Sequence, residues 1–367
     1  MQDIRLNRWA HTLVHYCLSL RAGETVAIYA TPTASPLVEA VYREVLRVGA
    51  YPVPVIALEG LEEILLREGN DDQLSHISPV QELLAERADA RLSIHSQNSP
   101  HALSNIDPAR AARRHRASRS LAGTSQRREQ AGAFRWCLTL YPTNGYAQDA
   151  NMSLSEFEEF VFDVCFLNDP DPIARWQELS QQQQRLVDWL VGRKQVHIVG
   201  PGTDLTLSIA DRRFINSDGK RNFPSGEFFT GPVENSANGV VQFAIPAAYN
   251  GHAVEGVRLV FQEGKVVEAS ASQGQDFLQQ MLELDEGARY LGEFAFGNNV
   301  RVTHASKNIL FDEKMGGTIH MALGNGYPET GSLNHSVLHW DMICDLRSQG
   351  EVWIDGILFL KDGKFVV

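Results

Sequence analysis

The stretch GETVAIYATPTASPLVEAVYREVLRVGAYPVPVI, residues 23–56, contains two short apolar runs separated by a helical segment. The runs at residues 25–29 and 52–56 predict two strands. Between them, Ser35 and Pro36 supply a cap and a first helical residue, so a helix is expected to begin here. A strand, a helix and a second strand in this order form a unit whose strands lie parallel. The stretch therefore predicts a parallel sheet covered by helices.

The same alternation of strands and helices extends over the first half of the chain. Capping residues mark further helix starts at Asp107, Ser153 and Asp171. Between these helices, residues 91–94 and 134–140 are predicted to be strands. The helix that begins after Asp171 is predicted to bridge to a second domain.

The pattern changes in the second half of the chain. Apolar residues alternate with polar ones at residues 205–209, and a period of two is typical of a strand with one buried face. Asp-Gly pairs near the carboxyl terminus separate apolar runs as in hairpins. The sequence therefore predicts an α/β domain with a mostly parallel sheet over residues 1–195. A β-rich α+β domain with one helix near residues 276–284 is predicted over residues 196–367.

The composition restricts the partners and the compartment. With 45 acidic and 33 basic residues, the net charge of -12 argues against nucleic acid as the main partner, and a peptide or small molecule fits better. The start of the chain, MQDIRLNRWAHTLVHYCLSL, lacks the features of a secretory signal, and no apolar run is long enough to cross a membrane. We therefore expect a cytoplasmic protein without a membrane partner. The four cysteines form no CxxC pair and are expected to be buried thiols.

Three carboxylates and two imidazoles lie in otherwise apolar segments of the second half, namely Glu227, Glu293, His320, His339 and Asp341. Charged groups are rarely left in apolar segments without compensation, and a metal ion is the compensation we expect. In a strand, His339 and Asp341 would project from one face, about 6.6 Å apart along the backbone. Oxygen and nitrogen ligands suit zinc, cobalt or manganese, and three carboxylates carry enough charge for two divalent ions. Because two such ions activate water, hydrolysis is the predicted reaction class.

Each of these residues also has a structural interpretation. Glu227 could cap a strand, Glu293 could pair with Arg289, and His320 could be a hydrogen-bonded core imidazole. His335 and His339 would share a face at helical spacing but would lie about 13 Å apart in a strand. The alternating pattern that follows it indicates a strand, so His335 is not expected to be a ligand.

Several motifs of other enzyme classes are missing from the sequence. It contains no HExxH, GxSxG, GxGxxG or GxxxxGK, which argues against the commonest zinc-helix proteases, α/β-hydrolases, dinucleotide enzymes and P-loop NTPases. The arginine-rich stretch at residues 110–128 has no interleaved aromatic residues. We therefore interpret it as a solvated helix face and loop rather than a nucleic-acid patch.

Four blocks of the second half resemble the signature of one peptidase family. They read PSGEFFTGPVENSANG (224–239), LDEGARYLGEFAFGNN (284–299), ILFDEKMGGTIHMALGNGYPETG (309–331) and LNHSVLHWDMICDLR (333–347). The family is that of aminopeptidase T and aminopeptidase S, the thermophilic metallo-aminopeptidases, and the likeness extends over nearly the whole chain. It implies removal of amino-terminal residues from peptides by a homodimer with a two-metal site.

The resemblance also implies roles for individual residues. Carried over position by position, the family's metal ligands fall on Glu227, Glu293, His320, His339 and Asp341. The family's tyrosine falls on Tyr327, a candidate to stabilise the oxyanion or complete the coordination, with packing beside Pro328 as the structural alternative. Glu293 is the carboxylate expected to act as the proton acceptor. Glu234 and Glu329 are weaker candidates to hold the ammonium group of the substrate.

Two other functions stay open on the sequence. A two-metal phosphoesterase would share the ligand chemistry but would need cations to clamp phosphate, and those near the ligand segments are Lys307, Lys314 and Arg347. A noncatalytic metal-stabilised binding protein would have a closed coordination sphere. The family block expected to read ETGG ends instead in Ser332, a departure that touches no predicted ligand.

Overall fold

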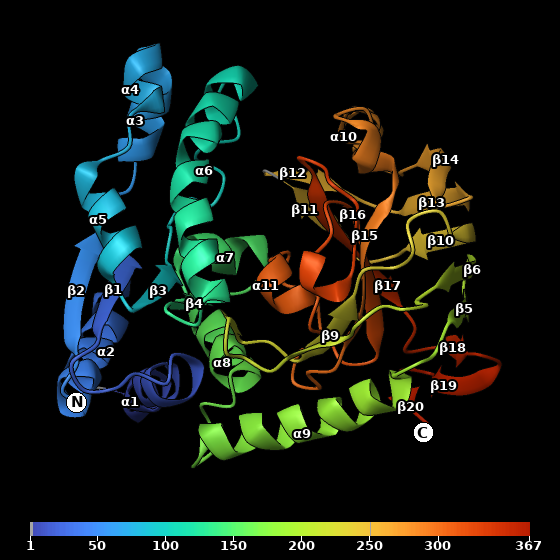
Figure 1. Cartoon of the computed structure of the whole chain (residues 1–367), viewed down its shortest axis with the longest axis horizontal. Coiled ribbons are helices and arrows are strands. Elements are labelled where there is room, and N and C mark those ends of the chain that lie inside the picture. Colours follow the sequence, from blue (N-terminus) through green and yellow to red (C-terminus); the bar gives the residue numbers. More distant parts are fainter. Residues whose placement is uncertain (1–2, 250) are drawn as a thin grey trace. The chain divides into compact units, whose positions relative to one another are not determined.

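The computed structural model describes residues 3–249 and 251–367 and divides the chain into two compact units (Figure 1). The first unit contains Met1–Arg175 and Gly219–Pro224, and the second contains Trp176–Asp218 and Ser225–Val367. The order of an α/β unit followed by a β-rich unit is the one predicted from the sequence.

The division between the units differs from the predicted boundary at residue 195. Helix α9 (Pro172–Leu190) begins in the first unit, but from Trp176 onward it belongs to the second. The reason is visible at Gln183, whose buried side-chain amide donates to the main-chain oxygen of Glu227 at 2.8 Å and to the side-chain oxygen of Asn216 at 2.7 Å. These contacts join the helix to strands of the second unit, and amino-acid spacing does not reveal them.

A five-stranded parallel sheet forms the centre of the first unit. Its strands are, in spatial order, β2 (Tyr51–Ile56), β1 (Thr25–Ala30), β3 (Ala90–His95), β4 (Arg135–Leu140) and β8 (Asn222–Phe223), and each neighbouring pair is parallel. Helix α2 (Ser35–Val48) connects β1 to β2 and ends at Gly49, whose positive φ of 82° suits a glycine. The predicted strand–helix–strand unit and parallel sheet are therefore confirmed.

Helices complete the first unit. They are α1 (Ile4–His11) with its continuation η1 (Thr12–Cys17), α3 (Leu61–Glu68), α4 (Asp71–Ser75), α5 (Pro79–Arg87), α6 (Pro108–Gln130), α7 (Asn144–Asp149) and α8 (Leu154–Val164). Two begin where the sequence predicts: the side chains of Asp107 and Ser153 accept hydrogen bonds from the main-chain N–H groups of Ala109 and Glu156.

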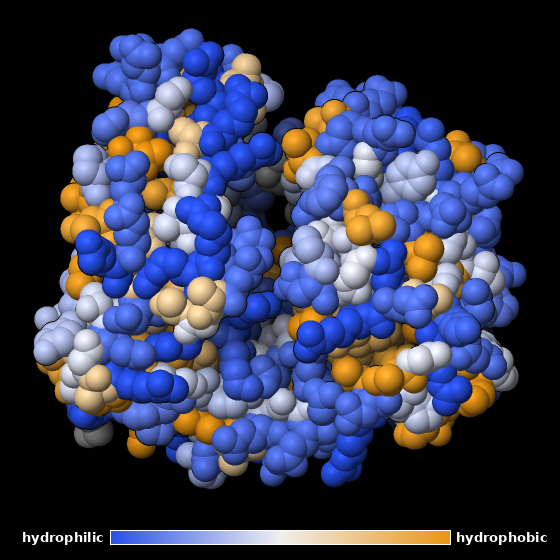
Figure 2. Space-filling model, viewed as in Figure 1, coloured by the Kyte–Doolittle hydropathy of each residue, from blue (hydrophilic) through white to orange (hydrophobic). Residues whose placement is uncertain are grey.

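The arginine-rich stretch forms part of α6, which has no buried residue and carries strongly hydrophilic side chains along its length (Figure 2). The predicted loop is absent because the helix continues through it. Arg110 donates to the main-chain oxygen of Leu66 at 2.5 Å, and Arg128 donates to those of Ala85 and Ala88 at 2.9 and 2.6 Å. These carbonyls lie at the ends of α3 and α5, where helices leave oxygens without intrahelical partners. The arginines therefore fasten α6 to its neighbours.

Two antiparallel sheets form the second unit. The smaller contains, in spatial order, β17 (His339–Asp345), β16 (Thr318–Gly324), β15 (Leu291–Gly297), β9 (Glu227–Thr230) and β7 (Ile215–Ser217). The larger contains β14 (Lys265–Ser270), β13 (Val257–Gln262), β10 (Asn238–Phe243), β6 (Thr203–Ser208), β5 (Gln195–Gly200), β18 (Glu351–Ile354), β19 (Ile357–Lys361) and β20 (Lys364–Phe365). Outside the sheets lie the hairpin β11 (Ala247–Tyr249) and β12 (His252–Val254) and the helices α10 (Gln275–Leu282) and α11 (Ile309–Asp312).

One hydrophobic core joins the two sheets. In the smaller sheet, the rings of Phe296 and Phe228 lie 5.0 Å apart. The ring of Phe296 also lies 5.2 Å from that of Phe359, which belongs to the larger sheet. The predicted hairpins are found at Asp355-Gly356 and Asp362-Gly363, where all four residues have positive φ, as a type I′ turn requires. The β-rich second domain and its helix α10 are thus confirmed.

Two further expectations concern the cysteines and the membrane. All four cysteines are free and buried, as predicted. Over residues 3–249 and 251–367, no helix combines the length and apolar character needed to cross a bilayer.

We expect Glu44→Gln to lower the free energy of unfolding by about 1–3 kcal/mol at pH 7. Glu44 is only 7% exposed and lies 3.0 Å from His11, 2.9 Å from His15 and 2.6 Å from Arg47. Burial acts to raise the pKa of Glu44, but these three partners lower it from 4.5 to about 2. A depressed carboxyl pKa stabilises the fold above the unfolded-state value and ceases to do so as the pH falls through the folded-state value.

Denaturant unfolding of the wild type and the variant at several pH values measures this effect. The difference should be largest above pH 4.5 and should shrink as the pH falls toward about 2. Glu39→Gln is the matched control because Glu39 lies on the same helix and contacts Arg43 at 3.1 Å, but its side chain is exposed. A pH-independent difference would contradict the prediction.

Candidate metal centre

The five residues predicted as ligands project from one face of the smaller sheet. Along the register, Glu293 on β15 pairs with Ala322 on β16, which pairs with Asp341 on β17. Directly opposed residues share a face, and so do residues two apart in a strand. His320 is two residues before Ala322, and His339 is two residues before Asp341.

Glu227 joins the same face through Gly297, which it opposes and which lies four residues after Glu293. The other positions between the ligands on this face are alanine or glycine, namely Ala295, Gly297, Ala322 and Gly324. Small residues leave space above the sheet. The opposite face carries Phe294, Met321 and Trp340, which are buried in the core between the sheets. One face therefore stabilises the fold while the other presents polar groups.

A β-bulge positions Glu293. The register between β15 and β16 shifts between Leu291 and Glu293, so Gly292 is an extra residue on its strand. A Cβ atom on Gly292 would lie 2.3 Å from the main-chain oxygen of Gly324, too close for any other residue without rearrangement. The bulge permits this approach and turns Glu293 toward the two histidines.

The donor atoms of the five side chains are close but mostly too far apart for hydrogen bonds with each other. The Nε2 atom of His320 lies 3.3 Å from Oε2 of Glu227 and 3.6 Å from Oε1 of Glu293. The Nε2 atom of His339 lies 3.4 Å from both Oε2 of Glu293 and Oδ2 of Asp341. Two ligands of one tetrahedral zinc ion, each bonded at about 2.0–2.1 Å, are roughly 3.3 Å apart. The observed separations match this value.

Several of these atoms are buried without a hydrogen-bond partner. Among the described residues, they include Oε2 of Glu227, both ring nitrogens of His320 and Oδ1 of Asp341. Buried polar atoms in proteins are almost always hydrogen-bonded, so such a cluster needs another explanation. Carboxylate oxygens and imidazole nitrogens are the donors that zinc, cobalt and manganese prefer. The residues present therefore fit a divalent cation, and His320 is not a satisfied core imidazole.

The structure adds a carboxylate that the sequence interpretation missed. Glu313 follows α11, and with His320 and Asp341 it forms one of the two groups in this cluster whose donor atoms all lie within 4.8 Å of one another. The other group is Glu293, His339 and Asp341. Asp341 is common to both, so the arrangement offers two neighbouring ligand sets with a shared carboxylate. The signal for Glu313 was its place inside the block at residues 309–331.

A lysine lies within the same cluster. Lys314 is fully buried, and its Nζ donates to Oε1 of Glu227 at 2.5 Å and also to Oε1 of Glu313. Burial acts to lower the pKa of Lys314, but the two carboxylates raise it above its ordinary value, so the ammonium stays charged. The sequence interpretation treated Lys314 as a candidate phosphate clamp. In the structure its ammonium is already bound by two carboxylates.

The cluster carries an excess of negative charge. Four carboxylates, those of Glu227, Glu293, Glu313 and Asp341, face one ammonium, which gives a net charge of −3 in the state that can bind cations, with all four ionised and the imidazoles neutral. Burial, opposed by Lys314 but assisted by Glu227 and Asp341, raises the pKa of Glu313 to about 8. Burial acts to lower the pKa of His320, but the surrounding carboxylates raise it to about 9. Both shifts show that the cluster attracts positive charge.

The tautomer of His339 is set by the main chain. Its Nδ1 lies 2.7 Å from the carbonyl oxygen of Asn325, which can only accept, so Nδ1 carries the proton and Nε2 is free as a ligand atom. The hydroxyl of Tyr327 is 3.5 Å from the same Nε2. Burial and the nearby carboxylates, Glu293 first, raise the pKa of Tyr327 well above its ordinary value, so the phenol stays protonated.

The remaining candidates lie outside the cluster. His335 is exposed in the loop before β17, and Arg289 donates weakly to the main-chain oxygen of Val266 rather than to Glu293. Glu234 binds Arg212 at 2.7 Å, the main-chain N–H of Leu333 at 2.7 Å and the hydroxyl of Ser332 at 3.4 Å. Glu234 thus holds a loop, and the departure at Ser332 contributes to that contact.

Comparison with known proteins identifies the family of this chain. The sequence model described as Thermophilic metalloprotease (M29) matches residues 2–365. Aminopeptidase 2 of Geobacillus stearothermophilus is 30% identical, with 98% of this chain and 96% of the relative covered. Aminopeptidase T of Thermus aquaticus is 29% identical, with 76% of this chain and 74% of the relative covered.

A solved structure has the same fold. The wild-type AmpT structure from Thermus thermophilus superposes with a TM-score of 0.86 and covers 100% of both chains at 24% identity. The resemblance found in the sequence is therefore confirmed. The chain belongs to the thermophilic metalloprotease family and is a metal-dependent peptidase.

Proposed function

We propose that the protein is an aminopeptidase with a two-metal centre. The observation that carries this proposal is the pair of ligand groups that share Asp341, since a bridging carboxylate is what two neighbouring cations require. Two divalent ions would also outweigh the net charge of the four carboxylates and Lys314, which one ion would not. The names of the relatives support removal of amino-terminal residues as the reaction.

The side chains of this cluster have distinct proposed tasks. Divalent ions, when bound, polarise the scissile carbonyl and lower the pKa of a water molecule toward neutrality. Glu293, between His320 and His339, can accept a proton from the attacking water as well as serve as a ligand. Tyr327 can donate its hydroxyl proton in a hydrogen bond to the carbonyl oxygen as negative charge develops there. Lys314 holds Glu227 and Glu313 in place through its two contacts.

The two alternative functions have less support. A phosphoesterase would need free cations, but Lys314 is bound by two carboxylates and Arg347 is paired with Asp345 at 2.7 Å. A noncatalytic structural site would be closed on all sides. The side chain of His339 is 29% exposed and Tyr327 is 36% exposed, so the cluster can be reached from solvent.

Activity assays with metal analysis test the proposal. The purified protein should cleave leucine p-nitroanilide but not its N-acetyl derivative or p-nitrophenyl phosphate. Chelation should abolish cleavage, and zinc, cobalt or manganese should restore it as about two ions per chain bind. Phosphatase activity alone, or two bound metals without any amide cleavage, would favour the alternatives. Light scattering of the same sample tests the homodimer that we also propose from the family resemblance.

Tyr327→Phe is expected to reduce kcat by roughly 10- to 100-fold while leaving the metal content unchanged. The substitution removes one donor from the carbonyl oxygen but keeps the ring, which packs 5.1 Å from Phe229 and 5.3 Å from His339. Steady-state kinetics and elemental analysis measure the two effects. Tyr290→Phe, just before β15, is the control and should change neither. Loss of metal from the Tyr327 variant would identify a ligand rather than a donor.

A further inference from the structure

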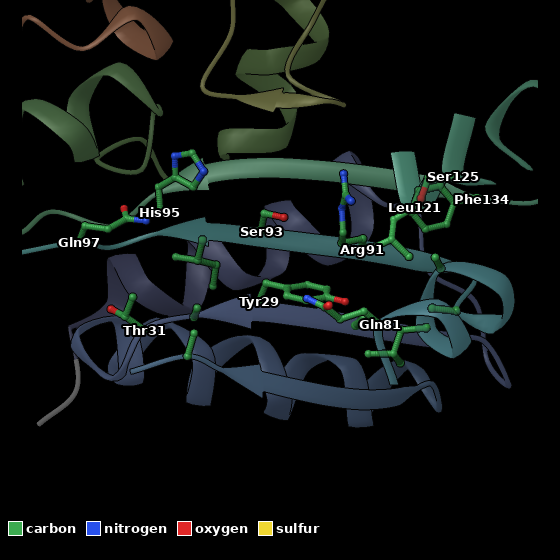
Figure 3. A pocket seen from close by; sticks show the side chains of 17 residues that line it. Tyr29, Thr31, Gln81, Arg91, Ser93, His95, Gln97, Leu121, Ser125 and Phe134 are labelled. Atoms are coloured by element: carbon green, nitrogen blue, oxygen red, sulfur yellow. The ribbon is translucent and has the colours of Figure 1, made fainter. Parts of the chain in front are cut away.

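A pocket of about 370 Å³ lies in the first unit, apart from the residues of the metal cluster, and its lining comes from this unit alone. It extends over β1 and β3 and is bordered by residues of α5 and α6, as Figure 3 shows. The spatial order β2-β1-β3-β4 means that the chain leaves β1 to one side and returns to the other. Open parallel sheets bind ligands at such a switch point, beyond the carboxyl ends of the strands. Thr31 and Gln97, which follow those ends, line one end of this pocket, and Arg91 and Phe134, near the amino ends of β3 and β4, line the other (Figure 3).

The sheet face that forms the floor of the pocket is unusually polar. Arg91, Ser93 and His95 rise from one face of β3, and Tyr29 lies beside them on β1, opposite Ser93 in the register (Figure 3). Parallel sheets are normally apolar on both faces because both are covered. The other face follows that rule here, as Val26, Ile28 and Leu92 are fully buried. The polar face therefore calls for a separate explanation.

Arg91 is the cation of this pocket. Its Nε is buried without a hydrogen bond, and among the described residues no carboxylate forms an ion pair with it. Glu129 has only a longer-range electrostatic interaction with Arg91. One carboxylate oxygen of Glu129 accepts a hydrogen bond from Trp136 at 3.1 Å, and the other forms an ion pair with Arg221 at 2.8 Å. The guanidinium carbon lies 6.0 Å from the centre of the Phe134 ring. A partly buried charge without a counterion is costly, so a ligand that supplies one is the simplest explanation.

We propose that this pocket binds a small organic monocarboxylate with an apolar body, whose carboxylate pairs with Arg91. One guanidinium matches one carboxylate through two parallel hydrogen bonds. A phosphate group would call for more charge or a glycine-rich loop. Neither is present here. Burial lowers the pKa of His95, so its imidazole adds no positive charge, and the segment after β1 reads Thr-Pro-Thr-Ala, without glycine. Leu84, Leu121 and Phe134 provide the apolar part of the lining. The proposal does not depend on the metal centre.

Calorimetric titration of the full chain, freed of metal by chelation, tests the proposal with three probes. N-acetyl-leucine carries the carboxylate and an apolar body but no ammonium group. N-acetyl-leucinamide is its neutral counterpart, and inorganic phosphate is the alternative anion. We expect saturable binding of the acid alone. Binding of acid and amide with equal affinity, preferential binding of phosphate, or no saturation by the acid up to about 10 mM would overturn the proposal.

Substitutions locate the binding. Arg91→Met should weaken binding of the acid about 10- to 100-fold. Arg87→Met removes the same charge from an exposed position on α5 and should leave the affinity unchanged. Asp341→Asn should also bind normally, which separates this pocket from the metal centre. Unchanged affinity in the Arg91 variant would overturn the assignment.

A second measurement does not depend on the choice of probe. Without ligand, Arg91→Met should melt at the same temperature as the wild type or higher, because the substitution removes a charge that no protein group compensates. A lower melting temperature than that of Arg87→Met would mean that Arg91 is satisfied within the protein. That result would count against the proposal.

Discussion

Asp341→Asn is expected to remove at least one of the two proposed metal ions and to reduce peptidase activity by roughly a thousandfold or more. Asp341 is the carboxylate common to both ligand groups, and its Oδ1 is buried without a hydrogen-bond partner. An amide of the same shape offers one neutral oxygen in place of two charged ones. It therefore weakens both ligand groups at once.

The metal-free variant should fold normally. Asparagine keeps the size of the side chain and an oxygen that can accept a hydrogen bond from the imidazole of His339, 3.4 Å away. Elemental analysis after dialysis, kinetics with leucine p-nitroanilide and circular dichroism measure the three quantities. Asp345→Asn is the matched control because Asp345 ends the same strand but pairs with Arg347. A folded Asp341 variant with both metals and normal turnover would refute the shared-ligand arrangement.

Glu293→Gln is expected to reduce kcat by about 100- to 10,000-fold in a folded protein. The two carboxylate oxygens of Glu293 face different histidines, at 3.6 Å from His320 and 3.4 Å from His339. Burial acts to raise the pKa of Glu293, but these two imidazoles lower it, so the carboxylate is ionised at neutral pH. Glutamine keeps the shape but can neither accept a proton nor neutralise a cation.

Metal content separates the two proposed tasks of Glu293. If the residue acts chiefly as a base, the variant should keep its metals and lose turnover at every pH. If it acts chiefly as a ligand, metal and turnover should be lost together. Glu351→Gln, on β18 and paired with Lys361, is the control and should resemble the wild type. Near-normal activity in a folded Glu293 variant would exclude both tasks.

Much of the cluster could be predicted because its ionisable residues lie in segments that are otherwise apolar. Glu227, Glu293 and His320 lie in strands in which every residue is buried, and charged groups in such strands need compensation. That argument requires only composition and the period of two. It fails for Glu313 and Lys314, because adjacent opposite charges after a short helix look like a solvated pair. Only the packing of that segment against β9 and β16 buries them.

The boundary between the units also depends on contacts that local sequence patterns do not reveal. The change from alternating strands and helices to strands alone is a local signal and was found near residue 195. The assignment of α9 to the second unit depends on the bonds from Gln183 to Glu227 and Asn216. These contacts join residues more than 30 positions apart in the chain.

By itself, the sequence determined the elements, the order of the two units, the family and the five side chains of the cluster, because each depends on short-range pattern or chemical type. The tertiary structure alone decided that these side chains share one face, that the bulge at Gly292 turns Glu293 inward, and that Glu313 and Lys314 join them. The physical reason is register. A shift of one residue between two strands would move every ligand of one strand to the opposite face, and the pairing that prevents it arises from contacts far apart in the chain.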